Sequence, residues 1–231
     1  MKIAIIPARG NSKRIRKKNL KKFYNKPIIQ WTIEKLKKSK LFDLIIVSSE
    51  DNKILKISKK LKCDLTIKRP KKLSGDDVTT IAVIKHAIKK INIEKKINIS
   101  VCCVYPCNPL LHIKDLKFAL SCLHKHKEKF IFSATDFSPQ FDAAFEIDKN
   151  NNVISKNTES VAKNKKNKLF YHDAGQFYWG FVKTWLKYNN IHKNSRIIEI
   201  PNWKVVDINT QNDWNKAKAL FKFIRFNKND F

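Results

Sequence analysis

The stretch Lys2-Ile-Ala-Ile-Ile-Pro-Ala-Arg-Gly-Asn-Ser-Lys-Arg14, followed by Lys18-Asn19, decides the fold of this chain. Its first six residues (2–7) form a short apolar run that ends at a turn former, which is typical of a buried parallel strand. The loop after this run supplies a glycine, a hydroxyl group and several cations. In open α/β sheets, ligands bind beyond the carboxyl ends of the strands, so we expect this loop to bind the phosphates of a nucleotide.

Apolar runs alternate with amphipathic segments along most of the chain. Strands are expected at 2–7, 43–48, 64–67, 98–105 and 130–135, and helices at 27–39, 51–61, 77–92 and 113–126. A last strand at either 196–200 or 203–206 precedes a helix from Asn212 to about Phe223. Repeated alternation of strand and helix predicts a three-layer α/β fold, with a mainly parallel sheet covered on both faces.

The regular pattern breaks after about residue 136. Residues 141–180 contain shorter alternating apolar stretches, and the tract 148–168 is rich in asparagine and lysine. We therefore expect one domain over 1–231, with an antiparallel insertion or flap at about 141–180 and a mobile loop at 148–168.

Composition limits the class of protein. The 49 Lys and Arg against 20 Asp and Glu give a formal net charge of +29. This charge is nearly all lysine, is spread along the chain and accompanies abundant Asn and Ile, so codon bias explains it better than nucleic-acid binding. A positive field would nevertheless attract an anionic substrate.

The chain has features of a soluble cytoplasmic protein. No apolar run reaches the roughly 18 to 20 residues that a membrane span needs, and the N-terminal run is too short for a signal peptide. Five cysteines without regular spacing argue against a disulfide framework or a zinc site, and reduced thiols agree with the cytoplasm.

The opening loop has the chemistry of a phosphate site without a common nucleotide signature. Ser12, Lys13 and the backbone around Gly10 are suited to bind a phosphate chain, and Arg9 and Lys18 to neutralise it. The loop matches neither GxGxxG nor GxxxxGK[ST]. On composition alone, ordinary solvated cations remain an alternative interpretation.

Five motifs resemble those of the CMP-sugar synthetases that activate sialic-type acids. Residues 6–13 with Lys18-Asn19 resemble the opening motif of that family, 47–51 (Val-Ser-Ser-Glu-Asp) the second, and 69–80 the third. Residues 101–110 and 171–180 are most similar to the branch that uses pseudaminic acid. The resemblance covers residue 1 to about 221. Kdo synthetases carry acidic residues after the strand that corresponds to 98–105, and residues 106–109 contain none.

This resemblance implies a Rossmann-like fold of the nucleotide-diphospho-sugar transferase type. It also implies the transfer of CMP from CTP to the anomeric hydroxyl of pseudaminic acid, a nine-carbon 2-keto acid sugar, with release of pyrophosphate. Mg²⁺ would be the cofactor, and a homodimer would form through 141–180. Legionaminic or N-acetylneuraminic acid is the alternative acceptor.

The resemblance also implies roles for individual residues. Arg9, Lys18 and Asp207 would act in catalysis, with Asp207 and Asn209 as metal ligands. The residues implied at the nucleotide are Ala8, Arg9, Gly10, Ser12, Lys13, Asn19, Arg69 and Thr80, and those implied at the sugar are Tyr105, Asn108, His172, Asp173 and Gln176.

Two departures from the family pattern affect these expectations. The metal motif of the family is Asp-Ile-Asp, whereas this chain has Asp207-Ile208-Asn209. An amide oxygen can ligate magnesium but brings no charge. The family has Ala-Thr-Ala-Pro where residues 106–109 are Pro-Cys-Asn-Pro, and Pro where Arg16 stands. A non-catalytic, basic, nucleic-acid-binding protein on a decayed synthetase scaffold is therefore the second hypothesis.

Overall fold

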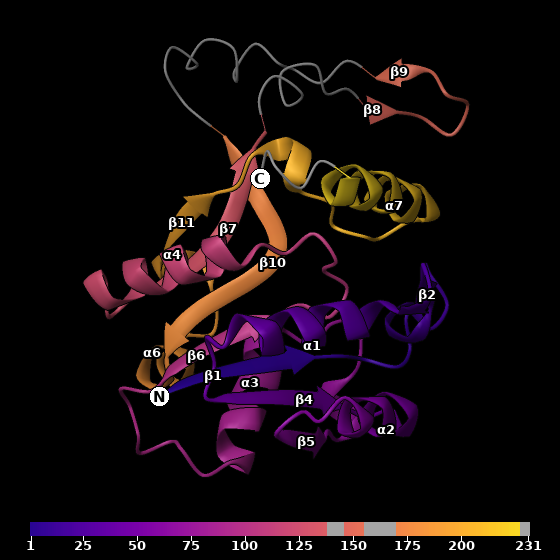
Figure 1. The fold of residues 1–231 in the computed structure, drawn as a ribbon. Coiled ribbons are helices and arrows are strands. Elements are labelled where there is room, and N and C mark those ends of the chain that lie inside the picture. Colours follow the sequence, from indigo (N-terminus) through magenta and orange to yellow (C-terminus); the bar gives the residue numbers. More distant parts are fainter. Residues whose placement is uncertain (138–145, 155–169, 227–231) are drawn as a thin grey trace.

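A computed structural model describes residues 1–137, 146–154 and 170–226, and its main feature is a seven-stranded sheet (Figure 1). The strands lie in the order β11-β7-β10-β6-β1-β4-β5. Strand β10 runs antiparallel to both neighbours, and every other pair is parallel. The strands are β1 (Lys2–Pro7), β4 (Leu44–Ser49), β5 (Leu65–Lys68), β6 (Ser100–Val104), β7 (Phe130–Asp136), β10 (Tyr171–Phe181) and β11 (Ser195–Glu199).

Helices cover both faces of this sheet, so the expected three-layer α/β fold is confirmed. One apolar cluster joins the sheet to α1 (Ile28–Ser39), α2 (Asn52–Lys60) and α4 (Ile113–Lys125). A second cluster joins the opposite face to α3 (Thr80–Lys90) and α6 (Val182–Lys187). Local capping fixes two of the helix starts, because the side chains of Asp51 and Thr79 accept hydrogen bonds from backbone N–H groups of α2 and α3.

Most of the predicted elements are confirmed, with shifts of a few residues at their ends. Of the two alternatives for the last strand, 196–200 is correct, since β11 occupies 195–199 and 203–206 forms no strand. The final helix is α7 (Gln211–Phe226). The hairpin of β8 (Glu146–Ile147) and β9 (Val153–Ile154) is antiparallel and stands apart from the large sheet in Figure 1.

The expected insertion at 141–180 is wrong at its C-terminal boundary. Residues 171–181 are not part of a flap but form β10, which lies between β6 and β7 in the central sheet. Polar residues at the start of β10 produced the error, because burial begins only at Ala174 and is continuous from Gln176 onward. Residues 141–145 and 155–169, including most of the tract expected to be a mobile loop, lie outside the described residues.

The strand order creates a switch point beside β1. The chain first adds β4 and β5 on one side of β1 and then returns to place β6 on the other side. The loops after β1 and β6 therefore diverge, which is where ligands bind in open α/β sheets. A third apolar cluster packs α7 against the loop after β1, through Trp214 and Phe221 on α7 and Ile15 and Phe23 on the loop.

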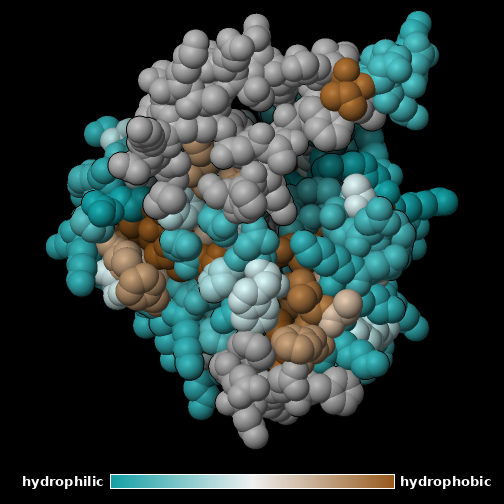
Figure 2. All heavy atoms as spheres, turned by 90° about the horizontal axis from the view of Figure 1, so that it is seen from above, coloured by the Kyte–Doolittle hydropathy of each residue, from teal (hydrophilic) through white to brown (hydrophobic). Residues whose placement is uncertain are grey.

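The coloured part of the face in Figure 2 is mostly hydrophilic. The face in Figure 2 shows smaller hydrophobic areas between hydrophilic side chains. Among the described residues, no helix is both long and apolar enough to span a membrane. The five cysteine thiols are free, as the sequence predicted.

Candidate active site

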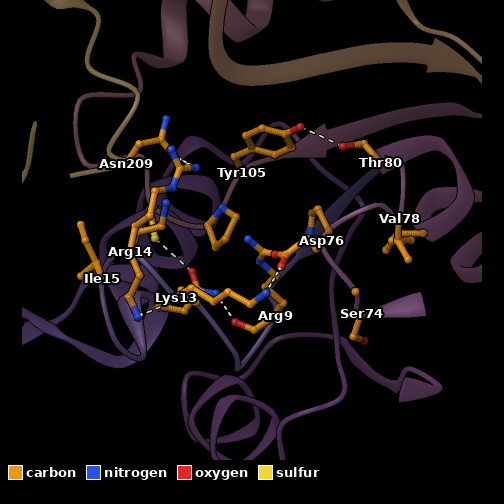
Figure 3. Close-up of a pocket in the computed structure, with 18 of the residues that line it drawn as sticks. Arg9, Lys13, Arg14, Ile15, Ser74, Asp76, Val78, Thr80, Tyr105 and Asn209 are labelled. Carbon is orange, nitrogen blue, oxygen red and sulfur yellow. Dashed lines mark hydrogen bonds and ion pairs between the residues drawn. The ribbon is translucent and has the colours of Figure 1, made fainter. Parts of the chain in front are cut away.

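A cleft of about 630 Å³ lies at the switch point (Figure 3). Its walls come from the opening loop after β1, the segment 69–83 around the start of α3, the loop after β6, and the segment before α7. The predicted site residues that line it are Arg9, Ser12, Lys13, Lys18, Asn19, Arg69, Thr80, Tyr105, Asp207 and Asn209.

Gly10 lets the opening loop lie directly against the start of α2. Its N–H donates to Glu50 Oε1 at 2.6 Å. A Cβ atom on Gly10 would lie 2.5 Å from Asp51 Oδ2, which is closer than side chains approach, so the loop requires glycine here. Further along the loop, Ser12 Oγ accepts a hydrogen bond from the backbone N–H of Lys18 at 3.0 Å. Contacts within the protein thus hold both parts of the loop.

Arg69 forms a buried ion pair behind the opening loop. Its Nη2 donates to Glu50 Oε2 at 3.0 Å, and the two side chains are only 3% and 14% exposed. Burial by itself would raise the pKa of Glu50, but the hydrogen bonds from Gly10, Arg69 and Ser74 outweigh it and hold this pKa below its ordinary value. Glu50 therefore stays ionised and joins the opening loop to the segment after β5.

The Asp76 cluster consists of Asp76, Arg9 and Lys13. Arg9 Nη1 lies 2.5 Å from Asp76 Oδ1, and Lys13 Nζ lies 2.7 Å from Oδ2. Figure 3 shows the three side chains meeting inside the cleft. Hydrogen bonds from both cations lower the pKa of Asp76. Two positive charges thus share one carboxylate, which leaves a net positive charge where phosphates are expected.

Asn19 is a buried amide held by two neighbours. Its Nδ2 donates to the carbonyl of Arg9 at 2.7 Å, and its Oδ1 accepts from Cys107 Sγ at 3.0 Å. Burial raises the pKa of Cys107 to about 12, so this thiol stays protonated and acts as a donor. On the opposite wall, the hydroxyls of Thr80 and Tyr105 lie 2.8 Å apart.

The Asp207 cluster consists of Asp207, Asn209 and Arg14. Asn209 Nδ2 donates to Asp207 Oδ2 at 2.6 Å, and Asn209 Oδ1 accepts from Arg14 Nη2 at 2.8 Å. The amide thus separates the carboxylate from the guanidinium. Within the described part of the chain, no cationic side chain forms an ion pair with Asp207.

Two contacts anchor the backbone of this cluster. Lys18 Nζ donates to the carbonyl of Ile208, so the opening loop holds it directly. A capping box begins α7, because Thr210 and Asp213 exchange side-chain to backbone hydrogen bonds, and Asp213 also accepts from the N–H of Asn209. The positions of residues 207–209 thus depend on both ends of the chain.

Six of the predicted site residues do not line the cleft. Ala8 is fully buried in the core, and Gly10 contributes only its backbone contact with Glu50. Asp173 is engaged by the N–H of Gly175 and by the side chains of Tyr178 and His192. The others that lie outside the cleft wall are Asn108, His172 and Gln176.

Sequence reasoning missed several residues that shape the cleft. Glu50 and Asp76 stand inside the quoted motifs, yet their partners are distant in sequence. Arg14 follows a run of cations and has no feature that marks it as the one facing Asn209. The contact of Cys107 with Asn19 had no sequence signal either, because the family pattern has threonine at this position and a threonine hydroxyl can also donate.

Comparisons with known proteins agree with this geometry. A family model described as "Cytidylyltransferase" matches residues 3–211. The pseudaminic acid cytidylyltransferase of Campylobacter jejuni subsp. jejuni serotype O:2 is 38% identical over 95% of this chain and 96% of its own. A Helicobacter pylori protein, named as that enzyme joined to a UDP-2,4-diacetamido-2,4,6-trideoxy-beta-L-altropyranose hydrolase, is 32% identical over 89% of this chain and 40% of its own.

Solved structures support the fold. The structure of CMP:2-keto-3-deoxy-manno-octonic acid synthetase complexed with CTP superposes with a TM-score of 0.73, covering 96% of this chain and 98% of that one at 14% identity. A 4-diphosphocytidyl-2C-methyl-D-erythritol synthase superposes with a TM-score of 0.69 over 95% of this chain and 97% of that one, at 10% identity. At these identities the likeness concerns the fold alone.

Proposed function

The chain belongs to the cytidylyltransferase family, and on that premise we propose that it transfers CMP from CTP to the anomeric hydroxyl of pseudaminic acid. The main support for this function is similarity over nearly the full length to a pseudaminic acid cytidylyltransferase. The cationic cleft at the switch point agrees with it. In the reaction, the anomeric oxygen forms a bond to the α-phosphorus. The bond from that phosphorus to the β-phosphate oxygen breaks, pyrophosphate leaves, and the hydroxyl proton passes to solvent.

The chain's own part in this reaction is to hold the substrates and to balance charge. Arg9, Lys13 and Lys18 line one cleft, and their cations would bind the triphosphate and the departing pyrophosphate. Within the described ranges, Lys18 Nζ donates one hydrogen bond, to the carbonyl of Ile208. A lysine ammonium has three donors, so others would be available to a phosphate. Asn19, Arg69 and Thr80 line the same cleft and would contact the nucleoside.

The residues of the Asp207 cluster fit one magnesium ion better than two. Among the residues that the structure describes, no cationic side chain pairs with Asp207, and Mg²⁺ takes one or two carboxylates together with substrate phosphates. The described residues contain no group of three or more metal-ligating side chains, so the ion would need the nucleotide as well. When bound, it would neutralise charge at the α-phosphate. Asn209 Oδ1 faces Arg14 and would have to turn to become a ligand.

Tyr105, beside Gly175 and Asp207, is the predicted sugar residue that lies in the cleft. Gly175 has a φ of +62°, and a Cβ atom there would lie 3.3 Å from Asp207 Cγ. We assign the acceptor to this end of the cleft, with Asn108, His172, Asp173 and Gln176 as predicted contributors. A homodimer in the cytoplasm is part of the same proposal, and light scattering of the purified protein tests the dimer.

Pyrophosphate release decides the function. The protein is incubated with CTP and MgCl2 and with pseudaminic, legionaminic or N-acetylneuraminic acid in parallel. We expect the highest kcat/KM with pseudaminic acid and no release when EDTA is present. Release with N-acetylneuraminic but not pseudaminic acid would overturn the acceptor. Absence of release with all three, together with salt-dependent binding of DNA or RNA, would instead support the nucleic-acid hypothesis.

A further inference from the structure

Helix α1 holds the loop between β6 and α4 (105–112), which we call the β6–α4 loop. Thr32 Oγ1 donates to the carbonyl of Pro106 at 2.8 Å and accepts from the N–H of Asn108 at 3.3 Å. One turn later, Lys35 Nζ donates to the carbonyls of Pro109 and Leu111 at 3.0 and 2.6 Å. Two side chains of one helix therefore bind four backbone groups of this loop.

The β6–α4 loop has little means of fixing its own shape. Two of its residues are prolines, which have no N–H to donate. In the described part of the chain, a single backbone–backbone hydrogen bond forms within residues 106–111, from the N–H of Leu111 to the carbonyl of Asn108. Thr32 and Lys35 consequently supply four backbone contacts that position the loop, in addition to the hydrogen bond from the N–H of Tyr105 to the carbonyl of Gln176.

The position of this loop matters to the cleft. Pro106 and Cys107 form part of the cleft wall, and Cys107 Sγ donates to Asn19 Oδ1. Asn19 in turn holds the carbonyl of Arg9. A continuous series of contacts thus leads from α1 through the β6–α4 loop to the residues expected at the nucleotide.

Lys35 is an unusual group for this task. Burial lowers the pKa of its ammonium to about 8. The carboxylate of the adjacent Glu34 does not neutralise the Lys35 ammonium, because it accepts hydrogen bonds from Lys26 and Gln30 instead. Lys35 lines a second cavity, of about 690 Å³, through which protons can exchange with solvent. The other charged or titratable groups lining that cavity are Lys26, Glu34, Lys38, His112, Asp115, Lys117, Lys204 and Arg225.

We propose that Lys35 is a positioning residue whose ammonium group, together with Thr32, holds the β6–α4 loop against Asn19 and so shapes the nucleotide side of the cleft. This proposal rests on the proposed function in one respect, namely that CTP is the nucleotide bound in the cleft. A neutral amine donates more weakly to carbonyls than an ammonium does. Affinity for CTP should therefore decline as the pH rises through about 8.

Fold stability should change in the opposite direction. The pKa of Lys35 in the folded chain, about 8, is lower than its ordinary value of 10.5. Between these values the unfolded chain binds more protons than the folded chain. The contribution of this group to the free energy of unfolding therefore increases with pH over that range. If CTP affinity fell because the whole fold was destabilised, affinity and fold stability would both decrease as the pH rises.

The test uses Lys35→Met, which keeps an unbranched apolar side chain and removes the donors. We expect KM for CTP, and Kd by calorimetry, to rise about 10-fold, as for the loss of charged hydrogen bonds, with kcat within about threefold of wild type. The wild-type increase in KM above pH 8 should vanish in this variant. Thr32→Val should raise KM and keep the pH dependence. The matched control is Lys37→Met, because Lys37 lies on the same helix and binds two carbonyls remote from the cleft.

A second readout needs no reaction and no nucleotide. Alkylation followed by peptide mapping measures the accessibility of Cys107, with Cys102 and Cys103 in β6 as reporters of global opening. We expect Cys107 in Lys35→Met to be labelled about 10-fold faster than in wild type, while Cys102 and Cys103 are unchanged. Equal acceleration at the three thiols, or wild-type labelling with wild-type CTP affinity, would overturn the proposal. Failure of every sugar to release pyrophosphate would overturn the proposed function and leave this readout intact.

Discussion

The Asp76 cluster and the Asp207 cluster lie in the same cleft and handle charge in opposite ways. In the Asp76 cluster, Arg9 and Lys13 bind one carboxylate directly. In the Asp207 cluster, the amide of Asn209 keeps the carboxylate and Arg14 apart. Under the proposed function, the first arrangement would keep an anion site filled by the protein's own carboxylate until a phosphate displaces it. The second would keep a carboxylate available for a cation that arrives with the substrate.

Asp207→Asn should give the largest effect, because it removes the one carboxylate of its cluster. We expect kcat to fall on the order of 1000-fold at saturating Mg²⁺, since the charge balance at the reacting phosphate is lost. The melting temperature should stay within about 2 °C of wild type, because Asp207 is exposed. Pyrophosphate release and thermal unfolding measure the two quantities. Activity within a few-fold of wild type would show that the Asp207 carboxylate is not needed for the reaction, and would contradict the contrast drawn between the two clusters.

Arg69→Gln tests the buried ion pair between Arg69 and Glu50, which lies behind the opening loop that carries Arg9 and Lys13. Leaving Glu50 buried without its partner should lower the free energy of unfolding by about 3 kcal/mol. Urea unfolding measures this, with the exposed Arg196→Gln as the control. The pKa of Glu50 lies below its ordinary value of 4.5, so its stabilising contribution is present above that pH and is lost as the pH falls through the folded-state pKa. This acid-side decline should be smaller in the variant, because the hydrogen bond from Gly10 still lowers the pKa of Glu50 while that from Arg69 is lost, and an unchanged decline would contradict the assignment.

Asn209→Asp would convert the amide spacer into a second carboxylate. An aspartate would pair with Arg14 and repel Asp207 unless a cation lay between them. We expect the Mg²⁺ concentration for half-maximal activity to fall about 10-fold, and calorimetry in the presence of CTP to show tighter Mg²⁺ binding. If neither quantity changes, residue 209 is not close enough to the ion to affect it.

Asp76→Asn should have the smallest effect and, unlike Asp207→Asn and Arg69→Gln, should be a gain. Removing the carboxylate frees Arg9 and Lys13 for the triphosphate, so Kd for CTP should fall about threefold, as expected for exposed pairs. The lowered pKa keeps Asp76 ionised at neutral pH, so the gain should be constant between pH 6 and 8. The neighbouring exposed Asp77→Asn is the matched control. Weaker CTP binding in Asp76→Asn would mean that Asp76 orders the cations instead of competing for them.

The sequence was sufficient to predict the layers of the fold and the cationic half of the cleft. The strands β1, β4 and β6 are short apolar runs, and their periodicity is independent of distant contacts. Strand β10 escaped prediction because its first residues are polar, although it lies between two other strands. Periodicity reports the average environment of a segment, and the environment of β10 changes along its length.

The partners of the cations could not be predicted for a different reason. Arg9 and Asp76 are 67 residues apart, and Arg14 and Asn209 are 195 apart. Only the folded sheet decides which carboxylate or amide meets which cation. The motifs therefore indicated the kind of chemistry, whereas the pairing, and with it the contrast between the two clusters, required the structure.

The packing of α7 on the opening loop has a consequence for how the protein is made. Lys21 in that loop meets Gln211 at the start of α7, a separation of 190 residues. At a synthesis rate of about 5–20 residues per second, the loop waits roughly 10–40 s for its partner helix to leave the ribosome. The opening loop therefore reaches its final surroundings only after α7 has been made. A nascent chain can complete its sheet before it can bind a nucleotide.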